Sequence, residues 1–371
     1  MKDPWIGIDI GGANLKAAHS SGWTNSCTFP MWKQYRSLAI SIATLLADAP
    51  AFCGVAVTMT GELADCFATR AEGVAVILEQ VTSVLPSAMV RVYCVDGSWL
   101  SVAQAARKPW DVAASNWHGL ARFAQRFATS DACMLIDVGS TTTDIIPLTR
   151  KGIAMQVRTD SQRLQSGSLV YTGVERSNTV GIVRELTLHE QSCPVMNELF
   201  ATALDVYVWL GLAPESPNNR DTADQQPATM AGARHRLARM VGEDGSTLTD
   251  RDIDLIANQI YQAQASMIAK GIQQVASIFP QGVQGKRPSK KSTSYTGRMV
   301  DEIKCILTSG HGDYLIETAL KQLQWEGITV KLRGTLGPSL SRCAPAYAIA
   351  VLASEELSSE SSDLSPCKNE L

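Results

Sequence analysis

The sequence predicts an α/β fold built from about two domains. Short apolar segments with strand character alternate with longer segments of helical periodicity, an arrangement typical of α/β proteins with a mostly parallel sheet. The length of 371 residues suits about two domains. A glycine-rich turn also occurs twice, about one domain apart, which favours two related domains.

The expected strands are short apolar runs bounded by polar or glycine residues. They are Trp5–Ile10, Cys53–Thr58, Val90–Val95, Cys133–Asp137, Asp144–Leu148 and Lys304–Thr308. The expected helices are Tyr35–Leu46, Glu72–Val84, Val102–Ala106, His118–Phe127, Glu198–Leu210, Ala231–Val241 and Asp252–Phe279. The last of these is preceded by Thr249 as an N-cap, and we expect it to end before Pro280.

Three segments are too polar to bury much apolar area and are expected to be loops or tails. They are residues 214–227, the basic segment 281–298 and the Ser/Glu-rich tail 354–371. We therefore expect a first domain over residues 1–129, and a second domain over residues 130–353 that includes a helical insertion and the basic segment. The tail is expected to be disordered.

Charge and hydropathy exclude several classes of protein. The formal net charge is −3, which argues against nucleic acid as the main partner, since phosphate binding needs a basic surface. No apolar run is long enough to span a membrane, and the first residues do not resemble a signal peptide. The nine cysteines contain no Cys-x-x-Cys pair, which is typical of thiols in a reducing cytoplasm.

The glycine turn and its echo are the strongest feature of the sequence. Residues 8–18 read IDIGGANLKAA and residues 136–146 read IDVGSTTTDII. Each copy predicts a strand, an aspartate near its end, a tight glycine turn and a second strand. Aligning the copies pairs Asp9 with Asp137 and Gly11 with Gly139.

Such a turn suits phosphate binding. Glycine brings backbone N–H groups close to a phosphate, and an aspartate at the strand end can hold Mg²⁺ that bridges phosphate oxygens. Lys16 can add a positive charge to the same oxygens. Two copies favour two related domains that face each other with phosphate held between their loops. The expected metal ligands are Asp9 and Asp137.

This arrangement resembles the actin/sugar kinase/Hsp70 superfamily, which implies two RNase H-like (actin-like ATPase) domains facing across a phosphate-binding cleft. The segment Ile306–Leu315 resembles a third superfamily element, a strand followed by a glycine turn and a helix start. The implied phosphate-binding residues are Gly11, Gly12, Asn14, Gly139, Ser140, Thr141, Thr142, Gly310 and Gly312.

Four other segments indicate which branch of the superfamily the sequence resembles. They are Val57–Phe67, Arg158–Asn178, Asn197–Gly211 and Ala233–Val241. The set looks like the hydantoinase/oxoprolinase-related branch, and more closely like the family of tetrahydromethanopterin-linked one-carbon-transfer pathway proteins. Archaeal members of that family are methanofuran-pathway synthases, which join an aminomethyl-furan-methyl diphosphate to the phenol of γ-glutamyltyramine and release diphosphate.

The resemblance implies a cytoplasmic transferase that uses a small-molecule diphosphate and a phenolic amine acceptor of the (glutamyl)tyramine or tyrosine type. Lys16 and Mg²⁺ would stabilise the departing diphosphate. Glu62, Asp65 or Asp160 would accept the phenol proton, with the first two favoured because they follow a strand at an expected cleft. Arg176 and His311 are candidate substrate-binding residues.

Two other functions remain possible interpretations of the sequence, because one fold serves several chemistries. The first is an ATP-dependent small-molecule kinase or ligase, for which Asp144 could be the base. The second is a non-catalytic, nucleotide-responsive assembly protein. The acceptor, ATP binding, the identity of the metal and a homo-oligomeric state are not decided by the sequence.

Overall fold

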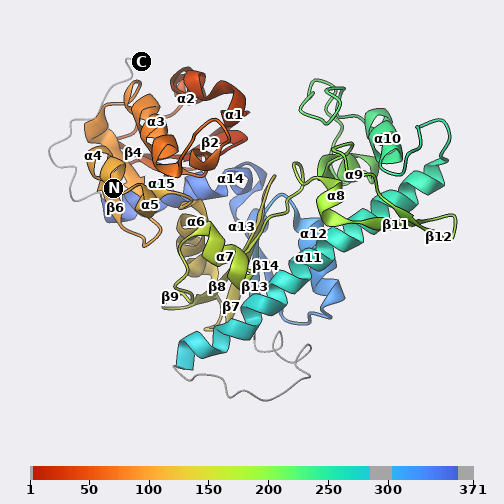
Figure 1. Ribbon diagram of the computed structural model, residues 1–371. Coiled ribbons are helices and arrows are strands. Elements are labelled where there is room, and N and C mark those ends of the chain that lie inside the picture. Colours follow the sequence, from red (N-terminus) through yellow and green to blue (C-terminus); the bar gives the residue numbers. More distant parts are fainter. Residues whose placement is uncertain (1–2, 285–302, 358–371) are drawn as a thin grey trace. The chain divides into compact units, whose positions relative to one another are not determined.

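The computed structural model describes residues 3–284 and 303–357 (Figure 1). For residues 279–284 the description covers the backbone only. The chain forms two compact units. Within the described residues, the first unit contains the parts of the chain up to residue 131, from 148 to 160 and from 331 onward, and the second contains those from 132 to 147 and from 161 to 330. The expected α/β class is confirmed. Among the described residues, no helix combines the length and the apolar character that crossing a membrane requires.

The first unit is built on a six-stranded sheet with the order β3-β2-β1-β4-β5-β6. Its strands are β1 Trp5–Ile10, β2 Asn14–His19, β3 Thr24–Thr28, β4 Gly54–Met59, β5 Val90–Tyr93 and β6 Trp99–Ser101. Its helical elements before the second unit are α1 Met31–Gln34, η1 Tyr35–Ser37, α2 Leu38–Leu46, η2 Gly61–Leu63, α3 Arg70–Thr82, η3 Ser87–Met89, α4 Val102–Arg107, α5 Pro109–Val112, α6 Asn116–Ala124 and η4 Gln125–Phe127.

Strand β1 separates two layers of this unit. Ile6, Ile8 and Ile10 belong to a core cluster that also contains residues of α2 and α3. The alternate residues face the C-terminal helix α15, Ala344–Glu356, because successive side chains on a strand point to opposite faces. A Cβ on Gly7 would lie 1.9 Å from the carbonyl oxygen of Ala346, so glycine lets α15 pass directly over β1.

This packing places the C-terminal helices in the first unit, which differs from the domains expected from the sequence. Helices α13 Leu332–Leu336, α14 Pro338–Arg342 and α15 all belong there, and β9 Gly152–Ile153 does too. The tail begins later than expected, because α15 continues through Ser354 to Glu356 and Ser354 Oγ donates a hydrogen bond to the Asp3 carbonyl. The remaining tail residues, 358–371, lie outside the described chain.

The second unit repeats the pairing pattern of the first. Its main path is β10-β8-β7-β13-β14, formed by Leu169–Val170, Thr143–Thr149, Cys133–Val138, Cys305–Gly310 and Ile328–Lys331. Strands β1 and β4 are parallel, as are β7 and β13. Both sheets are nevertheless mixed and not mostly parallel, because tight turns join antiparallel strands such as β1 and β2.

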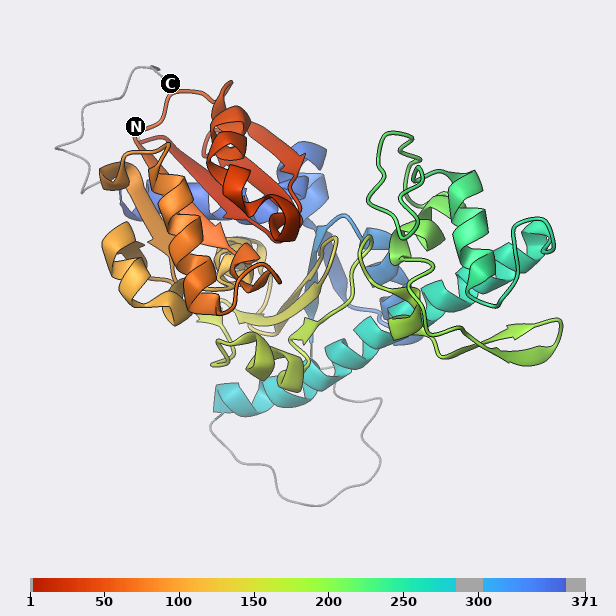
Figure 2. The same cartoon turned by 45° about the horizontal axis from the view of Figure 1, so that its top comes forward.

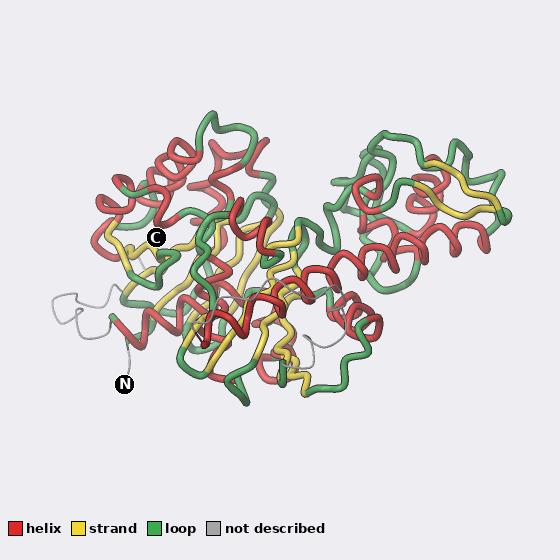
Figure 3. Tube along the Cα trace, turned by 60° about the horizontal axis from the view of Figure 1, so that its bottom comes forward, coloured by secondary structure: helices red, strands yellow, loops and turns green. Residues whose placement is uncertain are grey.

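The long helix α11, Asp250–Gln284, carries the helical insertion of the second unit (Figure 2). The other elements of this unit are α7 Asp160–Ser166, whose first residue still belongs to the first unit, α8 Thr179–Ile182, α9 Ala203–Trp209, α10 Met230–Arg239, α12 Asp313–Gln322 and the strands β11 Glu185–Leu188 and β12 Gln191–Pro194. The antiparallel hairpin of β11 and β12 lies beside one end of α11 (Figure 3).

Among the expected helix boundaries, two differ most from the structure. Helix α9 begins only after Thr202, because Thr202 and Asp205 form a capping box there, so residues 198–202 are not helical. Helix α11 continues past Pro280 to Gln284, so the missing N–H of proline did not end it. The expected basic loop 281–298 therefore starts within this helix, and its remaining residues, 285–298, lie outside the described chain.

Candidate functional site

The first glycine turn closes between β1 and β2, as the sequence predicted. The Gly11 amide donates a hydrogen bond to the Asn14 carbonyl at 3.0 Å, which places Gly12 at the tip of the turn. Residues after β4 support this turn, since a Cβ on Gly61 would lie 2.9 Å from the Gly11 carbonyl oxygen. The Gly61–Leu63 turn and the candidate phosphate loop are therefore immediate neighbours.

Asp9 and Lys16 lie on adjacent strands of this hairpin. Their Cα atoms are register partners, which puts both side chains on the same face of the sheet. Asp9 is buried, and Lys16 is half-buried. The Cys343 thiol, at the start of α15, is close to both: burial raises its pKa, Lys16 lowers it and Asp9 raises it. A carboxylate and a cation thus lie on neighbouring strands, on the same face of the sheet, near the glycine turn.

Glu62 lies in the short turn that follows β4, and only 1% of its surface is exposed. Burial raises its pKa from an ordinary value of 4.5 to about 7, although the Arg70 guanidinium opposes that shift. Within the described part of the chain, its Oε2 atom has no hydrogen-bond partner. A carboxylate of this kind can gain and lose a proton near neutral pH.

Arg70, which the sequence analysis missed, joins two of the predicted residues. Its Nε atom lies 3.8 Å from Glu62 Oε1, and its Nη2 atom donates a hydrogen bond to Asp160 Oδ2 at 2.8 Å. Its guanidinium carbon lies 5.4 Å from the centroid of the Trp110 ring. An arginine at the start of an expected helix is too common a feature to have been singled out from sequence.

Asp65 does not join this group, although the sequence placed it beside Glu62. It lies three residues further along the chain and is exposed. Of the three predicted bases, the structure therefore brings Glu62 and Asp160 together through Arg70 and leaves Asp65 at the surface.

The second glycine turn reproduces the first in the second unit. The Gly139 amide donates to the Thr142 carbonyl at 2.9 Å, the counterpart of the Gly11–Asn14 bond. Thr141 and Thr142 are half-buried, as is Asp137 in the preceding strand. The two turns that match in sequence therefore also form the same hydrogen bond.

A segment after β10 covers this second turn. The Glu175 and Arg176 amides both donate to the Ser140 carbonyl at 3.0 Å. A Cβ on Gly173 would lie 2.6 Å from the Thr141 nitrogen, so only glycine lets the two segments meet this closely. The Arg176 side chain is exposed.

A buried hydrogen-bond network fixes that covering segment to α11. The Gln264 side chain is buried and donates to Thr172 Oγ1 and to the Gly173 carbonyl, both at 2.8 Å. It accepts a hydrogen bond from the Tyr207 hydroxyl of α9. The helical insertion is thereby connected to the second glycine turn.

The third predicted element lies beside the second. Strand β13 ends at Gly310, whose φ of 86° suits glycine, and a Cβ there would lie 2.1 Å from the Val138 carbonyl oxygen. Gly312 precedes α12. His311 Nε2 lies 3.4 Å from Ser140 Oγ and 3.6 Å from Glu175 Oε1. His311 therefore joins the second turn, together with Glu175, which the sequence analysis missed.

Two other polar groups have structural partners. Asp144, the base considered for a kinase or ligase, forms a buried ion pair with Arg163. Arg236 is fully buried and pairs with Asp205 at 2.7 Å and with Asp224 at 2.9 Å. These groups hold the second unit together.

The described residues contain no cluster of side chains that marks a magnesium site. Among the described residues, no group of three or more histidine, cysteine, aspartate and glutamate side chains is arranged to hold a metal. Mg²⁺ bound to phosphate groups commonly uses only one or two carboxylates and completes its shell with water and phosphate oxygens, so Asp9 and Asp137 remain predicted ligands.

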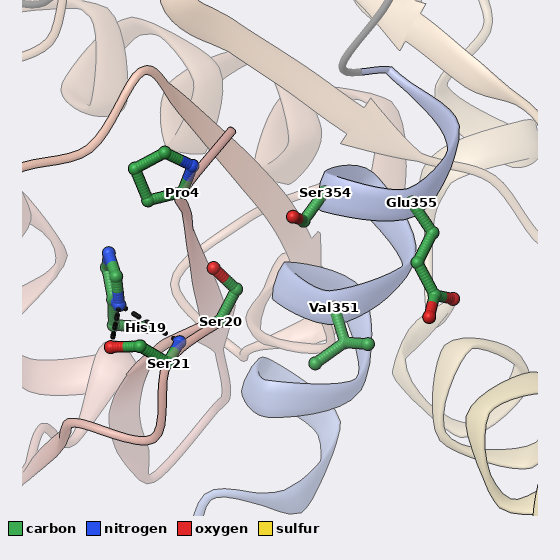
Figure 4. Close-up of a pocket in the computed structure, with 7 residues that line it drawn as sticks. All are labelled: Pro4, His19, Ser20, Ser21, Val351, Ser354 and Glu355. Atoms are coloured by element: carbon green, nitrogen blue, oxygen red, sulfur yellow. Dashed lines mark hydrogen bonds between the residues drawn. The ribbon is translucent and has the colours of Figure 1, made fainter. Parts of the chain in front are cut away.

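A pocket of about 300 Å³ lies at the other end of β1 from the glycine turn (Figure 4). His19 lines it and bonds through Nδ1 to Ser21, while Val351, Ser354 and Glu355 face it from α15. Burial lowers the pKa of His19. No predicted site residue lines this pocket, so we do not assign the function to it.

Comparisons with known proteins agree with the fold and with the family resemblance. A family model described as hydantoinase/oxoprolinase matches residues 54–356. A (4-{4-[2-(γ-L-glutamylamino)ethyl]phenoxymethyl}furan-2-yl)methanamine synthase from Methanocaldococcus jannaschii is 28% identical over 96% of this chain and 99% of its own. The synthase of the same name from Methanococcus vannielii is 25% identical over 62% of this chain and 93% of its own.

Among solved structures, the nucleotide-free form of an acetone carboxylase is similar, with a TM-score of 0.55 and 9% identity. The match covers 94% of this chain and 70% of that chain. At this identity the likeness concerns the fold alone. Together with the repeated pairing of the two sheets, it agrees with the expected class of actin-like ATPase domains.

Proposed function

The chain belongs to the hydantoinase/oxoprolinase family, and we propose that it is a transferase of methanofuran-type cofactor biosynthesis in tetrahydromethanopterin-linked one-carbon metabolism. It would condense an aminomethyl-furan-methyl diphosphate with the phenol of a (glutamyl)tyramine- or tyrosine-like acceptor and release diphosphate. The names of the two relatives, each describing a phenoxymethyl-furan product, support a furan donor and a phenolic acceptor, and the diphosphate leaving group is part of the proposal.

The observation that carries the proposal is the buried Glu62 beside the first glycine turn. A phenol has an ordinary pKa of about 10, so it needs a base as it attacks. Glu62, with a pKa of about 7, is matched to that task near neutral pH. In the proposed step, the phenol oxygen bonds to the furan methylene carbon and its proton passes to the Glu62 carboxylate.

The bond that breaks joins the methylene carbon to the diphosphate oxygen, whose electron pair leaves with the diphosphate. The furan ring delocalises the positive charge that develops on the methylene carbon. Lys16 and the amides of the glycine turns would stabilise the departing charge. Mg²⁺ is part of the proposal, with Asp9 and Asp137 each proposed as a ligand, and would neutralise charge on the diphosphate oxygens.

The experiment is a turnover assay with the furan diphosphate, Mg²⁺ and a series of phenolic amines. We expect diphosphate release that depends on the acceptor. Glu62→Gln should lower the rate about 100-fold or more, the usual effect of losing a general base. Glu79→Gln changes an exposed glutamate of α3 and is the matched control. Equal rates for Glu62→Gln and the wild type would contradict the assignment of the base.

A further inference from the structure

The helix that carries Arg70 is fixed against the turn that carries Glu62. A Cβ on Gly73 would lie 2.1 Å from the Glu62 carbonyl oxygen, so the first turn of α3 lies directly on the backbone of Glu62. Arg70 opens that helix, and Thr69 caps it by accepting a hydrogen bond from the Glu72 amide. The position of Arg70 relative to Glu62 is therefore set by backbone packing.

The guanidinium group is also held on its other sides. Asp160 accepts its hydrogen bond at 2.8 Å, and the Trp110 ring lies 5.4 Å away. Only 10% of the Arg70 side chain is exposed, whereas Trp110 is 62% exposed. Two partners thus restrain an arginine that would otherwise have many rotamers.

Charged groups around Glu62 come from two helices. Arg70 of α3 contributes the positive charge, and Asp160 of α7 contributes a negative one that acts in the opposite direction. The connection before α6 adds a backbone N–H, that of Ala114. Burial disfavours the charged carboxylate, and Arg70 is the strongest of the groups that favour it, ahead of the backbone N–H groups of Glu62 and Ala114.

We propose that Arg70 is a positioning residue: held by Asp160 and Trp110, it aims the Glu62 carboxylate and keeps it available in its ionised form. The inference rests on the proposed function only in assigning Glu62 as the base of the reaction. The electrostatic relationship itself can be measured without turnover.

The test is an infrared titration of the protein, with the Glu62 carboxyl band identified by subtracting the spectrum of Glu62→Gln. Arg70→Met should raise the pH midpoint of Glu62 by about one unit or more, because an attractive charge is lost. Arg70→Lys should raise it less. Asp160→Asn should lower it, because a repulsive charge is lost. Arg36→Met is the control, since Arg36 is an exposed arginine over the Tyr35 ring.

Opposite shifts in the Arg70→Met and Asp160→Asn variants support the proposal, and shifts in the same direction or none overturn it. Arg70→Lys, which retains the charge, serves if Arg70→Met does not fold. The pH dependence of kcat adds a second readout. In Arg70→Met its acidic limb should move to higher pH by the same amount, whereas a merely structural role would lower kcat equally at every pH.

The outcomes separate this inference from the proposed function. If Glu62 titrates as expected but no variant releases diphosphate from the furan substrate, the positioning role stands and the synthase assignment fails. If the wild type turns over and the Glu62 midpoint is unchanged in Arg70→Met, the synthase assignment stands and the positioning role fails.

Discussion

Arg70 donates a hydrogen bond to Asp160 at 2.8 Å, although 90 residues separate them in the sequence. This bond connects the start of α3 to the first residue of α7, and both residues belong to the first unit. It explains why Glu62 and Asp160, two of the three candidate bases, belong to one group in which Glu62 is the buried member.

Glu62 should make the protein less stable as pH rises. Its pKa is about 7 in the folded chain and 4.5 in the unfolded chain, so the folded state binds the proton more tightly. The resulting stabilisation is complete below pH 4.5 and is lost as pH rises through 7. Glu62→Gln removes this dependence. Relative to the wild type, its free energy of unfolding should improve by about 2 kcal/mol between pH 5 and pH 8.

Urea denaturation at several pH values measures this difference, with Glu79→Gln as the control. A constant difference between Glu62→Gln and the wild type across this range would show that Glu62 keeps an ordinary pKa.

Gly173 should be essential for the shape of the second glycine turn. In Gly173→Ala the added methyl group would lie 2.5 Å from the Gly139 carbonyl oxygen and 2.6 Å from the Thr141 nitrogen, both of which are backbone atoms of the turn. We expect a loss of at least tenfold in diphosphate affinity by calorimetry. Gly181→Ala is the control, because no atom lies within 4 Å of its added Cβ. Equal affinities for the two variants would mean that this turn does not bind diphosphate.

Arg236 should be a major source of stability in the helical insertion. Its side chain is 0% exposed, and it pairs with Asp205 and Asp224. Arg236→Met leaves the buried Asp205 carboxylate without this charge partner, which should cost about 3–5 kcal/mol of unfolding free energy. Arg239→Met also removes a bond to Asp224, but Arg239 is 46% exposed, and the cost should be below about 1 kcal/mol. Comparable losses in urea denaturation would contradict the distinction between them.

Diphosphate release should require a divalent cation. Chelation with EDTA should abolish it, and excess Mg²⁺ should restore it. Asp9→Asn should raise the Mg²⁺ concentration needed for half-maximal rate at least tenfold, because a carboxylate ligand is replaced by a weaker amide. Asp48→Asn, at an exposed position of the same unit, should leave it unchanged. Full activity in EDTA would remove the metal from the proposed reaction.

The local features of the fold could be predicted because their causes are local. The strand at Trp5–Ile10 and both glycine turns follow from apolar runs and from residues that a tight turn requires. The return of α15 to the first unit could not be predicted. This helix is apolar around most of its surface, so its sequence does not indicate which sheet it covers.

The candidate site was predictable only in part, for the same reason. Glu62 and His311 follow strands in recognisable turns, whereas Arg70 and Glu175 acquire their roles from residues distant in the sequence. Asp65 had the same local signals as Glu62. Burial separates the two, and burial depends on how α3 packs against the turn after β4.

The most direct measurement of the central claim is a single reaction analysed by mass spectrometry. It contains the furan diphosphate, Mg²⁺, ATP and tyramine carrying ¹⁸O in its phenol group. We predict a phenoxymethyl-furan product that retains the ¹⁸O, one diphosphate released for each product, and unchanged ATP. Consumption of ATP with a phosphorylated acceptor, and no aryl ether, would contradict the account.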